Sequence, residues 1–199
     1  MSAREEILAR VGRPRPIEPV ERGYRRAGAL SPAERVELFC ERAGEYRAEV
    51  RRVDDVGAAV EDVCRARSVG RLLVPSGVPV AWRPHQAELV ADTLLTAPEL
   101  DAVDGVLTGC TAAIAETGTI VLSSGAREGR RALTLVPDLH LCVVERAQVV
   151  ATVPEAIRAL QGARGPFTFV SGPSATSDIE LDRVEGVHGP RRLEVLIAG

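Results

Sequence analysis

The sequence contains no lysine, so all 25 basic residues of this 199-residue chain are arginine. A mechanism that needs a lysine Schiff base or the lysine of a P-loop is therefore excluded. An excess of positive charge is also lacking, because 28 acidic residues leave a formal net charge of −3. That balance argues against a protein that binds nucleic acid through a basic field.

Long hydrophobic runs and paired cysteines are missing as well. No run approaches the ~20 apolar residues of a membrane span. The first ten residues carry four charges and no apolar core of a signal peptide, so we expect a cytoplasmic protein. Cysteines 40, 64, 110 and 142 are widely separated and form no C-x-x-C pair. Neither a zinc ribbon nor an iron–sulfur cluster is therefore expected on this chain alone.

What is present is the composition of a folded protein, with 45% hydrophobic and 27% charged residues. Residues 1–30 are predicted to be an N-terminal arm with a proline-rich linker, because prolines 14, 16 and 19 prevent a continuous helix. Residues 31–199 are predicted to form an α/β domain. Ser31-Pro-Ala-Glu34 has the pattern of a capping box that opens its first helix.

Short apolar runs alternate with stretches of helical periodicity along this domain. Helices are expected over residues 1–11, 31–43, 56–64, 86–95, 112–116 and 152–160. Strands are expected over residues 47–53, 72–74, 105–107, 119–122, 139–144, 167–170 and 193–197. This alternation predicts a mostly parallel sheet with helices on both faces.

Three polar segments follow predicted strands, at residues 108–111, 123–125 and 171–174. In a parallel sheet such segments gather at the carboxyl edge, where ligands usually bind. Their glycines allow close approach to the backbone, whose N–H groups suit a small anionic ligand. Arg127, Arg130 and Arg131 lie nearby and would add positive charge. The alternative is that these segments are ordinary turns with solvated arginines.

Glu116 lies in a second compact motif, Ala115-Glu-Thr-Gly-Thr119. A partly buried carboxylate there would serve as a base or nucleophile, and we expect it to share one cleft with residues 172–180. In the alternative, Gly118 ends a helix and Glu116 only accepts hydrogen bonds from nearby backbone.

Two of the three histidines fall in segments that could carry a site. Asp178, Glu180 and His188 have ligand chemistry, but their spacing does not show that they converge. We expect them to hold a loop, with no bound metal. His140 falls inside an apolar strand, where a hydrogen-bonded core histidine is the simpler expectation.

Four segments, taken together, resemble the lactate-utilisation protein C family, the stand-alone LUD-domain proteins: residues 109–122, 135–140, 171–180 and 186–190. The resemblance extends from about residue 50 to the end of the chain, with a mild departure at Ser177. It implies a sheet of the type found in CoA transferases and sugar-phosphate isomerases. It also implies that the protein works beside two partner subunits, one of them carrying iron–sulfur clusters, in oxidising L-lactate to pyruvate.

Three functions therefore stay open from the sequence. The first is a component of an L-lactate oxidation system; the second is a self-sufficient enzyme that uses Glu116 on a phosphorylated or CoA-linked metabolite; the third is a non-catalytic scaffold. The sequence does not distinguish a homo-oligomer from a monomer. Besides Glu116, the candidate ligand-binding residues are Gly109, Thr111, Thr117, Gly118, Thr119, Ser124, Arg131, Gly172, Ser174, Thr176, Asp178, Glu180 and His188.

Overall fold

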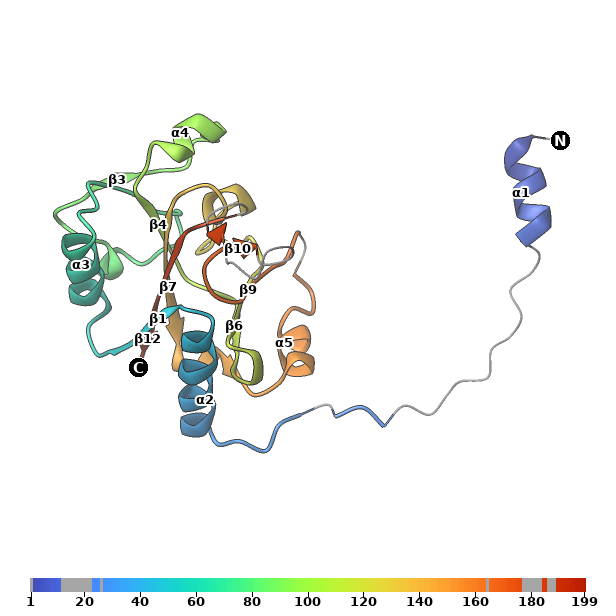
Figure 1. The fold of residues 1–199 in the computed structure, drawn as a ribbon, viewed down its shortest axis with the longest axis horizontal. Helices are drawn as coiled ribbons and strands as arrows, with labels where there is room; N and C mark the ends of the chain where they lie inside the picture. Colours follow the sequence, from blue (N-terminus) through green and yellow to red (C-terminus); the bar gives the residue numbers. More distant parts are fainter. Residues whose placement is uncertain (1, 12–22, 26, 164, 177–183, 186–188) are drawn as a thin grey trace.

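The computed structural model describes residues 2–11, 23–25, 27–163, 165–176, 184–185 and 189–199. A main sheet of six parallel strands runs in the order β1-β12-β7-β4-β2-β3 (Figure 1). Its strands are β1 (Glu49–Val53), β2 (Arg71–Leu73), β3 (Glu88–Val90), β4 (Gly105–Thr108), β7 (Leu139–Glu145) and β12 (Arg192–Ala198).

A second sheet has the order β8-β5-β6-β9 and is mostly antiparallel, since only the β5–β8 pair is parallel. Its strands are β5 (Ala112–Ile114), β6 (Thr119–Leu122), β8 (Val149–Val150) and β9 (Thr168–Val170). The short strands β10 (Ala175–Thr176) and β11 (Val184–Glu185) form a separate antiparallel pair.

The α-helices are α1 (Ala3–Val11), α2 (Pro32–Glu45), α3 (Val56–Ala66), α4 (Ala97–Asp101) and α5 (Val153–Ala159). Single 3₁₀ turns are η1 (Val80–Trp82), η2 (Ala115–Thr117), η3 (Arg131–Thr134) and η4 (Arg146–Gln148). The predicted capping box at α2 is confirmed, because the Ser31 N–H donates to the Glu34 carboxylate over 2.8 Å and the Glu34 N–H donates to the Ser31 hydroxyl.

Groups of buried apolar residues show how the helices and the two sheets are layered. Helix α3 packs on one face of the main sheet, with Val60 and Val63 against Leu107 and Leu141. The other face is covered by α2 and the second sheet together. Helix α5 covers the outer face of the second sheet. The predicted parallel sheet with helices on both faces is thus confirmed, while the second sheet was not predicted.

Two predicted helices are wrong. Over residues 86–95 the chain forms β3 as an edge strand beside β2 and then bends. The carboxylate of Asp92 accepts hydrogen bonds from the N–H groups of Leu94 and Leu95, each over 3.1 Å, which holds the bend. Over residues 112–116 the chain forms buried β5 and then η2, because β5 pairs with strands on both of its sides. Alanine's helix propensity is overridden by this pairing.

The strand predicted over residues 167–170 exists as β9, but it is not buried in the parallel sheet. It is an edge strand of the second sheet, and 47% of Phe169 is exposed. The strand at residues 119–122 also belongs to the second sheet. Residues 123–125 and 171–174 therefore follow strands of the second sheet and not strands of the parallel sheet.

The N-terminal residues contact the domain only in part. No residue of α1 is buried. Further along, the Gly28 N–H donates to the Glu155 carboxylate over 3.0 Å, so the arm touches α5. The division of the chain at residue 30 stays a prediction, as does the likeness of the main sheet to CoA transferases. Within the described residues no helix is both long enough and apolar enough to cross a bilayer.

Candidate functional site

A cavity of about 290 Å³ opens where α2 ends and where β7 and β12 begin. Its volume suits a small organic ligand. Four stretches of the chain form its wall, so it depends on the whole fold. They are Tyr46; Thr134, Leu135 and His140; residues 168–174; and Gly189, Pro190 and Leu193.

Two of the segments that carry the resemblance, each with a Gly-Pro pair (residues 172–173 and 189–190), meet in this wall. The Ser174 N–H donates to the Pro190 carbonyl over 2.8 Å. Gly172 has a φ of +80°, and an added Cβ would lie 2.3 Å from the Tyr46 carbonyl oxygen. Only glycine allows that backbone conformation together with that approach. The loop is therefore fixed both to the end of α2 and to the segment before β12.

A short chain of hydroxyls links this loop to the motif around Glu116. The Thr119 hydroxyl lies 2.8 Å from that of Ser171, and the Thr117 hydroxyl donates to Thr119 over 2.7 Å. The predicted residues Thr117 and Thr119 thus support the loop from behind. Thr119 itself is buried and is not part of the cavity wall.

His140 brings an imidazole to the base of the cavity. It is 1% exposed, and its Nε2 lies 2.8 Å from the Thr108 hydroxyl, so the expected hydrogen-bonded core histidine is found. The buried thiol of Cys142 follows on the same face of β7. Its pKa is lowered to about 6 by hydrogen bonding to Cys110, with further contributions from His140 and Thr108. The same hydrogen bond between the two thiols, together with burial, raises the pKa of Cys110.

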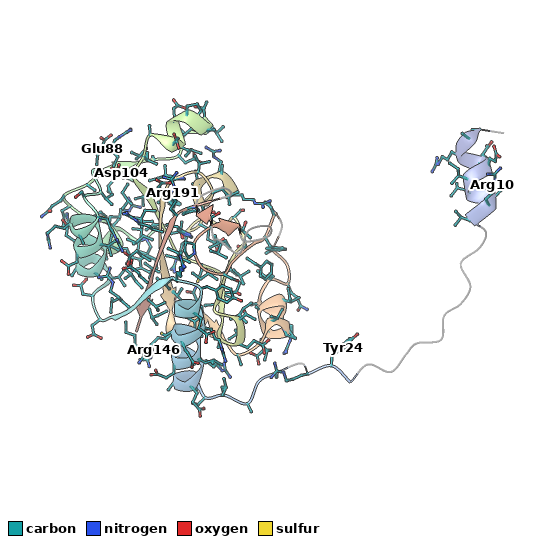
Figure 2. The ribbon with its side chains drawn as sticks, in the orientation of Figure 1. Arg10, Tyr24, Glu88, Asp104, Arg146 and Arg191 are labelled. Carbon is teal, nitrogen blue, oxygen red and sulfur yellow. The ribbon has the colours of Figure 1, made fainter. Side chains whose placement is uncertain are left out.

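The cavity lies at the amino edge of the main sheet, which corrects the expectation of a carboxyl-edge position for the 171–174 loop. Figure 2 shows the two edges: Arg191, directly before β12, lies above, and Arg146, directly after β7, lies below. The rule for parallel strands does not apply to this loop, because β9 runs in the second sheet.

The other two polar segments do gather near the carboxyl end of β4. The hydroxyls of Thr111 and Ser123 lie 2.7 Å apart, and the Gly109 N–H donates to the Arg127 carbonyl over 3.0 Å. At their centre is Glu128, which is 4% exposed. Its carboxylate accepts hydrogen bonds from the N–H groups of Ser123 and Gly125 and from the Thr111 hydroxyl, over 2.6–2.9 Å. Glu128 was not among the predicted residues, although an ionised carboxylate has the capacity to accept several hydrogen bonds at once.

Glu116 is not among the residues that line the cavity. Its side chain is 26% exposed, and one carboxylate oxygen accepts a hydrogen bond from the Val153 N–H over 2.9 Å at the start of α5. The other oxygen forms an ion pair with Arg25 of the arm. The expectation that Glu116 shares this cavity with residues 172–174 is therefore not met. Whether it has a catalytic role stays a prediction.

The remaining candidates are scattered. Gly118 packs against the α2 backbone, where a Cβ would lie 2.4 Å from the Ala43 nitrogen. The Ser124 hydroxyl donates to the Pro166 carbonyl over 3.3 Å, and Arg131 is exposed outside the cavity wall. Thr176 lies in β10. Asp178, Glu180 and His188 are outside the described residues.

A metal centre does not emerge from the part of the chain that the structure describes, where no three His, Cys, Asp or Glu side chains come together. The prediction of no bound metal stays open, since three of the possible ligands are among the residues not described. The described residues of the cavity wall offer neutral hydroxyls, backbone groups and one imidazole, and no arginine is among them. Such a wall can hydrogen-bond a small polar organic acid.

Comparison with known proteins matches the LUD domain model over residues 36–198. A lactate utilization protein C of Deinococcus radiodurans is 46% identical over 85% of this chain and 82% of its own length. A protein of the same name from Bacillus pumilus is 41% identical over 42% of this chain and 38% of its own length. Among solved structures, a DUF162 family protein from Deinococcus radiodurans has a TM-score of 0.76 at 39% identity, covering 85% of this chain and 99% of that one.

Proposed function

The chain belongs to the LUD domain family, and on that premise we propose that it is a component of a lactate utilisation system. In this proposal the cavity between α2, β7 and β12 binds a small organic acid. The observation that carries the proposal is the meeting of the two Gly-Pro segments in the wall of one cavity. They belong to two of the four segments that carry the resemblance in the sequence.

The finer form of the proposal is that the system oxidises L-lactate to pyruvate with iron–sulfur partner subunits. Oxidation of a 2-hydroxy acid to a 2-oxo acid releases two electrons and two protons, so the system needs an electron acceptor. The thiols of this chain do not fit a cluster. Cys64, a residue of α3, packs on one face of the main sheet, whereas Cys110 and Cys142 lie on the other. Cluster chemistry is therefore assigned to a partner.

The contribution of this chain would be to bind and orient the acid. Ser171 and His140 offer a hydroxyl and an imidazole at the cavity wall, and the Thr108 contact fixes the imidazole ring. A self-sufficient enzyme that uses Glu116 is less well supported, because that carboxylate is occupied by α5 and the arm. A phosphorylated substrate is also less well supported, because no arginine is found among the described residues that line the cavity.

The test is growth on L-lactate after clean deletion of the gene, in a strain without a duplicate. Growth should be lost and should return with the wild-type gene. Affinity purification of the tagged protein from lactate-grown cells should recover a cluster-bearing protein. Normal growth of the deletion strain would overturn the proposal.

Ligand binding is tested separately on the purified protein. L-lactate or pyruvate should raise the melting temperature, while acetate, which lacks the second oxygen function, should raise it less. Ser171→Ala removes a hydroxyl from the cavity wall and should weaken binding about fivefold, the effect of one hydrogen bond. The matched control Ser124→Ala removes a hydroxyl outside the wall and should leave binding unchanged. Equal effects of both variants would count against the cavity.

A further inference from the structure

A second cavity, of about 450 Å³, opens at the carboxyl edge of the main sheet. Its wall includes residues 74–76 directly after β2, residues 91–92 directly after β3, and residues 125–126 of the loop after β6. The cavity between α2, β7 and β12 lies at the opposite edge, and we call it the first cavity. The two walls share no described residue, so a ligand of one is separate from a ligand of the other.

The chain leaves β2 and β4, which are neighbours in the main sheet, toward opposite faces. After β2 it passes to η1, where Trp82 packs with α3. After β4 it passes to Cys110 and Ala113, which pack with α2 on the other face. Such a divergence opens a crevice at the carboxyl ends of parallel strands, and open α/β sheets usually bind ligands there. The topology of the sheet therefore favours this edge for a ligand.

The loop of residues 125–129 spans this divergence and fixes the shape of the cavity. The Gly77 N–H donates to the Ala126 carbonyl over 3.0 Å on the β2 side, and the Gly109 N–H donates to the Arg127 carbonyl over 3.0 Å on the β4 side. Gly77 has no room for a side chain, since an added Cβ would lie 2.6 Å from the carbonyl carbon of Ala126. These backbone contacts preform the cavity, which lowers the entropy cost of binding.

Arg83 brings a positive charge to this cavity. Its Nε and Nη2 donate to the Val78 carbonyl over 3.2 and 2.7 Å, and these contacts orient the guanidinium without neutralising it. Among the described residues, Nη1 has no hydrogen-bond partner and no carboxylate pairs with Arg83. Asp92 also lines the cavity, but its carboxylate pairs with Arg130 over 2.7 Å. The described wall therefore carries one positive charge that is not balanced.

Most of the remaining wall is apolar. Val74, Pro75 and Leu133 are buried residues that line it, and the Ser76 hydroxyl adds a polar group. A guanidinium binds both carboxylates and phosphates. One positive charge matches the single charge of a carboxylate better than the charge of about −2 on a phosphate monoester. The apolar residues match a hydrocarbon chain better than the hydroxyl of lactate.

We propose that the second cavity binds a monocarboxylate with an apolar body. The carboxylate lies at Arg83, and the hydrocarbon chain lies against Val74, Pro75 and Leu133. This inference goes beyond the proposed function, because it does not require lactate in the first cavity. The chain then binds two acids of different character, one at each edge of the main sheet.

The test is calorimetric titration of the full chain with hexanoate, which has one carboxylate and an apolar chain. Hexanoate should bind. Hexanamide, its neutral analogue, should bind at least about tenfold more weakly, because it lacks the charge-assisted hydrogen bonds. Hexyl phosphate should also bind more weakly than hexanoate. The proposal is wrong if hexanoate does not bind, if hexanamide binds equally well, or if hexyl phosphate binds more tightly.

Three variants locate the binding. Arg83→Gln should weaken hexanoate binding at least about tenfold. Arg35→Gln is the matched control and should leave binding unchanged, because the Arg35 guanidinium also donates to a backbone carbonyl, that of Leu30, but lies outside the cavity wall. Ala91→Phe, at an exposed residue of the wall, should block the cavity with Arg83 still in place. It therefore tests the site even if Arg83→Gln does not fold, and unchanged binding in Ala91→Phe would overturn the proposal.

Competition with L-lactate separates this site from the first cavity. An excess of L-lactate should leave the hexanoate titration unchanged, since the two walls share no described residue. Displacement of hexanoate by L-lactate, or loss of hexanoate binding in Ser171→Ala, would place hexanoate in the first cavity and overturn the second site. Failure of L-lactate to bind at all would count against the proposed function alone.

Discussion

Gly172 lies against the backbone carbonyl of Tyr46, with so little space that a Cβ on Gly172 would stand 2.3 Å from that oxygen. This contact joins the end of α2 to the loop that walls the cavity. Both residues line the cavity, although they lie far apart in the sequence. The shape of the candidate site therefore depends on one position where no side chain is tolerated.

Gly172→Ala should lower the free energy of unfolding by roughly 2–4 kcal/mol, because it combines a left-handed backbone with a steric clash. Urea denaturation measures the change. Gly162→Ala is the matched control: its φ is +89°, but nothing lies within 4 Å of an added Cβ. Gly162→Ala should lower the free energy of unfolding only by the backbone strain, roughly 1–2 kcal/mol. Equal losses at the two positions would show that the Tyr46 contact contributes nothing.

Local signals in the sequence predicted most of the main sheet and its helices. The capping box at Ser31 and the apolar run over residues 139–144 were sufficient, since both depend on neighbours in the chain. Residues 112–114 were predicted as helix because alanine favours it, but their conformation is decided by β6 and β8, which come later in the sequence. Pairing between distant segments is not visible in a local pattern.

The candidate site was predicted only in part for the same reason. The loop at residues 171–174 is recognised from its turn chemistry. The prediction that it lies at the carboxyl edge of the main sheet is wrong, because β9 belongs to the second sheet and not to the parallel sheet. Tyr46 and His140 enter the cavity wall only through tertiary packing. Glu128 was missed because a lone glutamate in a polar stretch looks like any solvated carboxylate.

Glu128→Gln should destabilise the protein by about 2–3 kcal/mol, because a buried carboxylate loses charge-assisted hydrogen bonds and an amide N–H₂ would face existing donors. Thermal and urea unfolding measure the loss. Glu88→Gln, at a side chain 66% exposed, removes the same charge and should change stability by less than about 1 kcal/mol. If both variants are equally stable, the Ser123–Gly125 turn does not depend on Glu128.

Asp92 should make stability depend on pH in the acid range. The Arg130 guanidinium, 2.7 Å from its carboxylate, holds the pKa of Asp92 below its ordinary value of 3.8. A carboxyl with a lowered pKa stabilises the fold above that ordinary value, and the contribution is lost as the pH falls through the lower one. Asp92→Asn should therefore lower the free energy of unfolding by about 1–2 kcal/mol at pH 7. The difference in this free energy between the variant and the wild type should shrink below pH ~3.8. A difference that stays constant from pH 7 to pH 3 would contradict this account.

Substitutions at Glu116 distinguish a structural role of its carboxylate from a catalytic role. Its contacts with the Val153 N–H and with Arg25 place it between α5 and the arm. Glu116→Gln keeps an oxygen that accepts from the Val153 N–H and loses only the charge. It should therefore lower the free energy of unfolding by less than about 1 kcal/mol. Glu116→Ala loses the hydrogen bond at the start of α5 as well and should cost about 1 kcal/mol or more. Arg25→Ala, at a side chain 67% exposed, should be close to neutral.

The same three variants, expressed in the deletion strain, separate the two roles by growth on L-lactate. Since the carboxylate points to α5 and the arm rather than into the cavity, we expect all three strains to grow at the wild-type rate while the proteins differ in stability in the stated order. A catalytic carboxylate would give the opposite pattern: Glu116→Gln would abolish growth at nearly unchanged stability, and Arg25→Ala would still grow. That pattern would restore Glu116 as a base, and it would require the reacting molecule to reach Glu116 from the side of the arm instead of through the cavity.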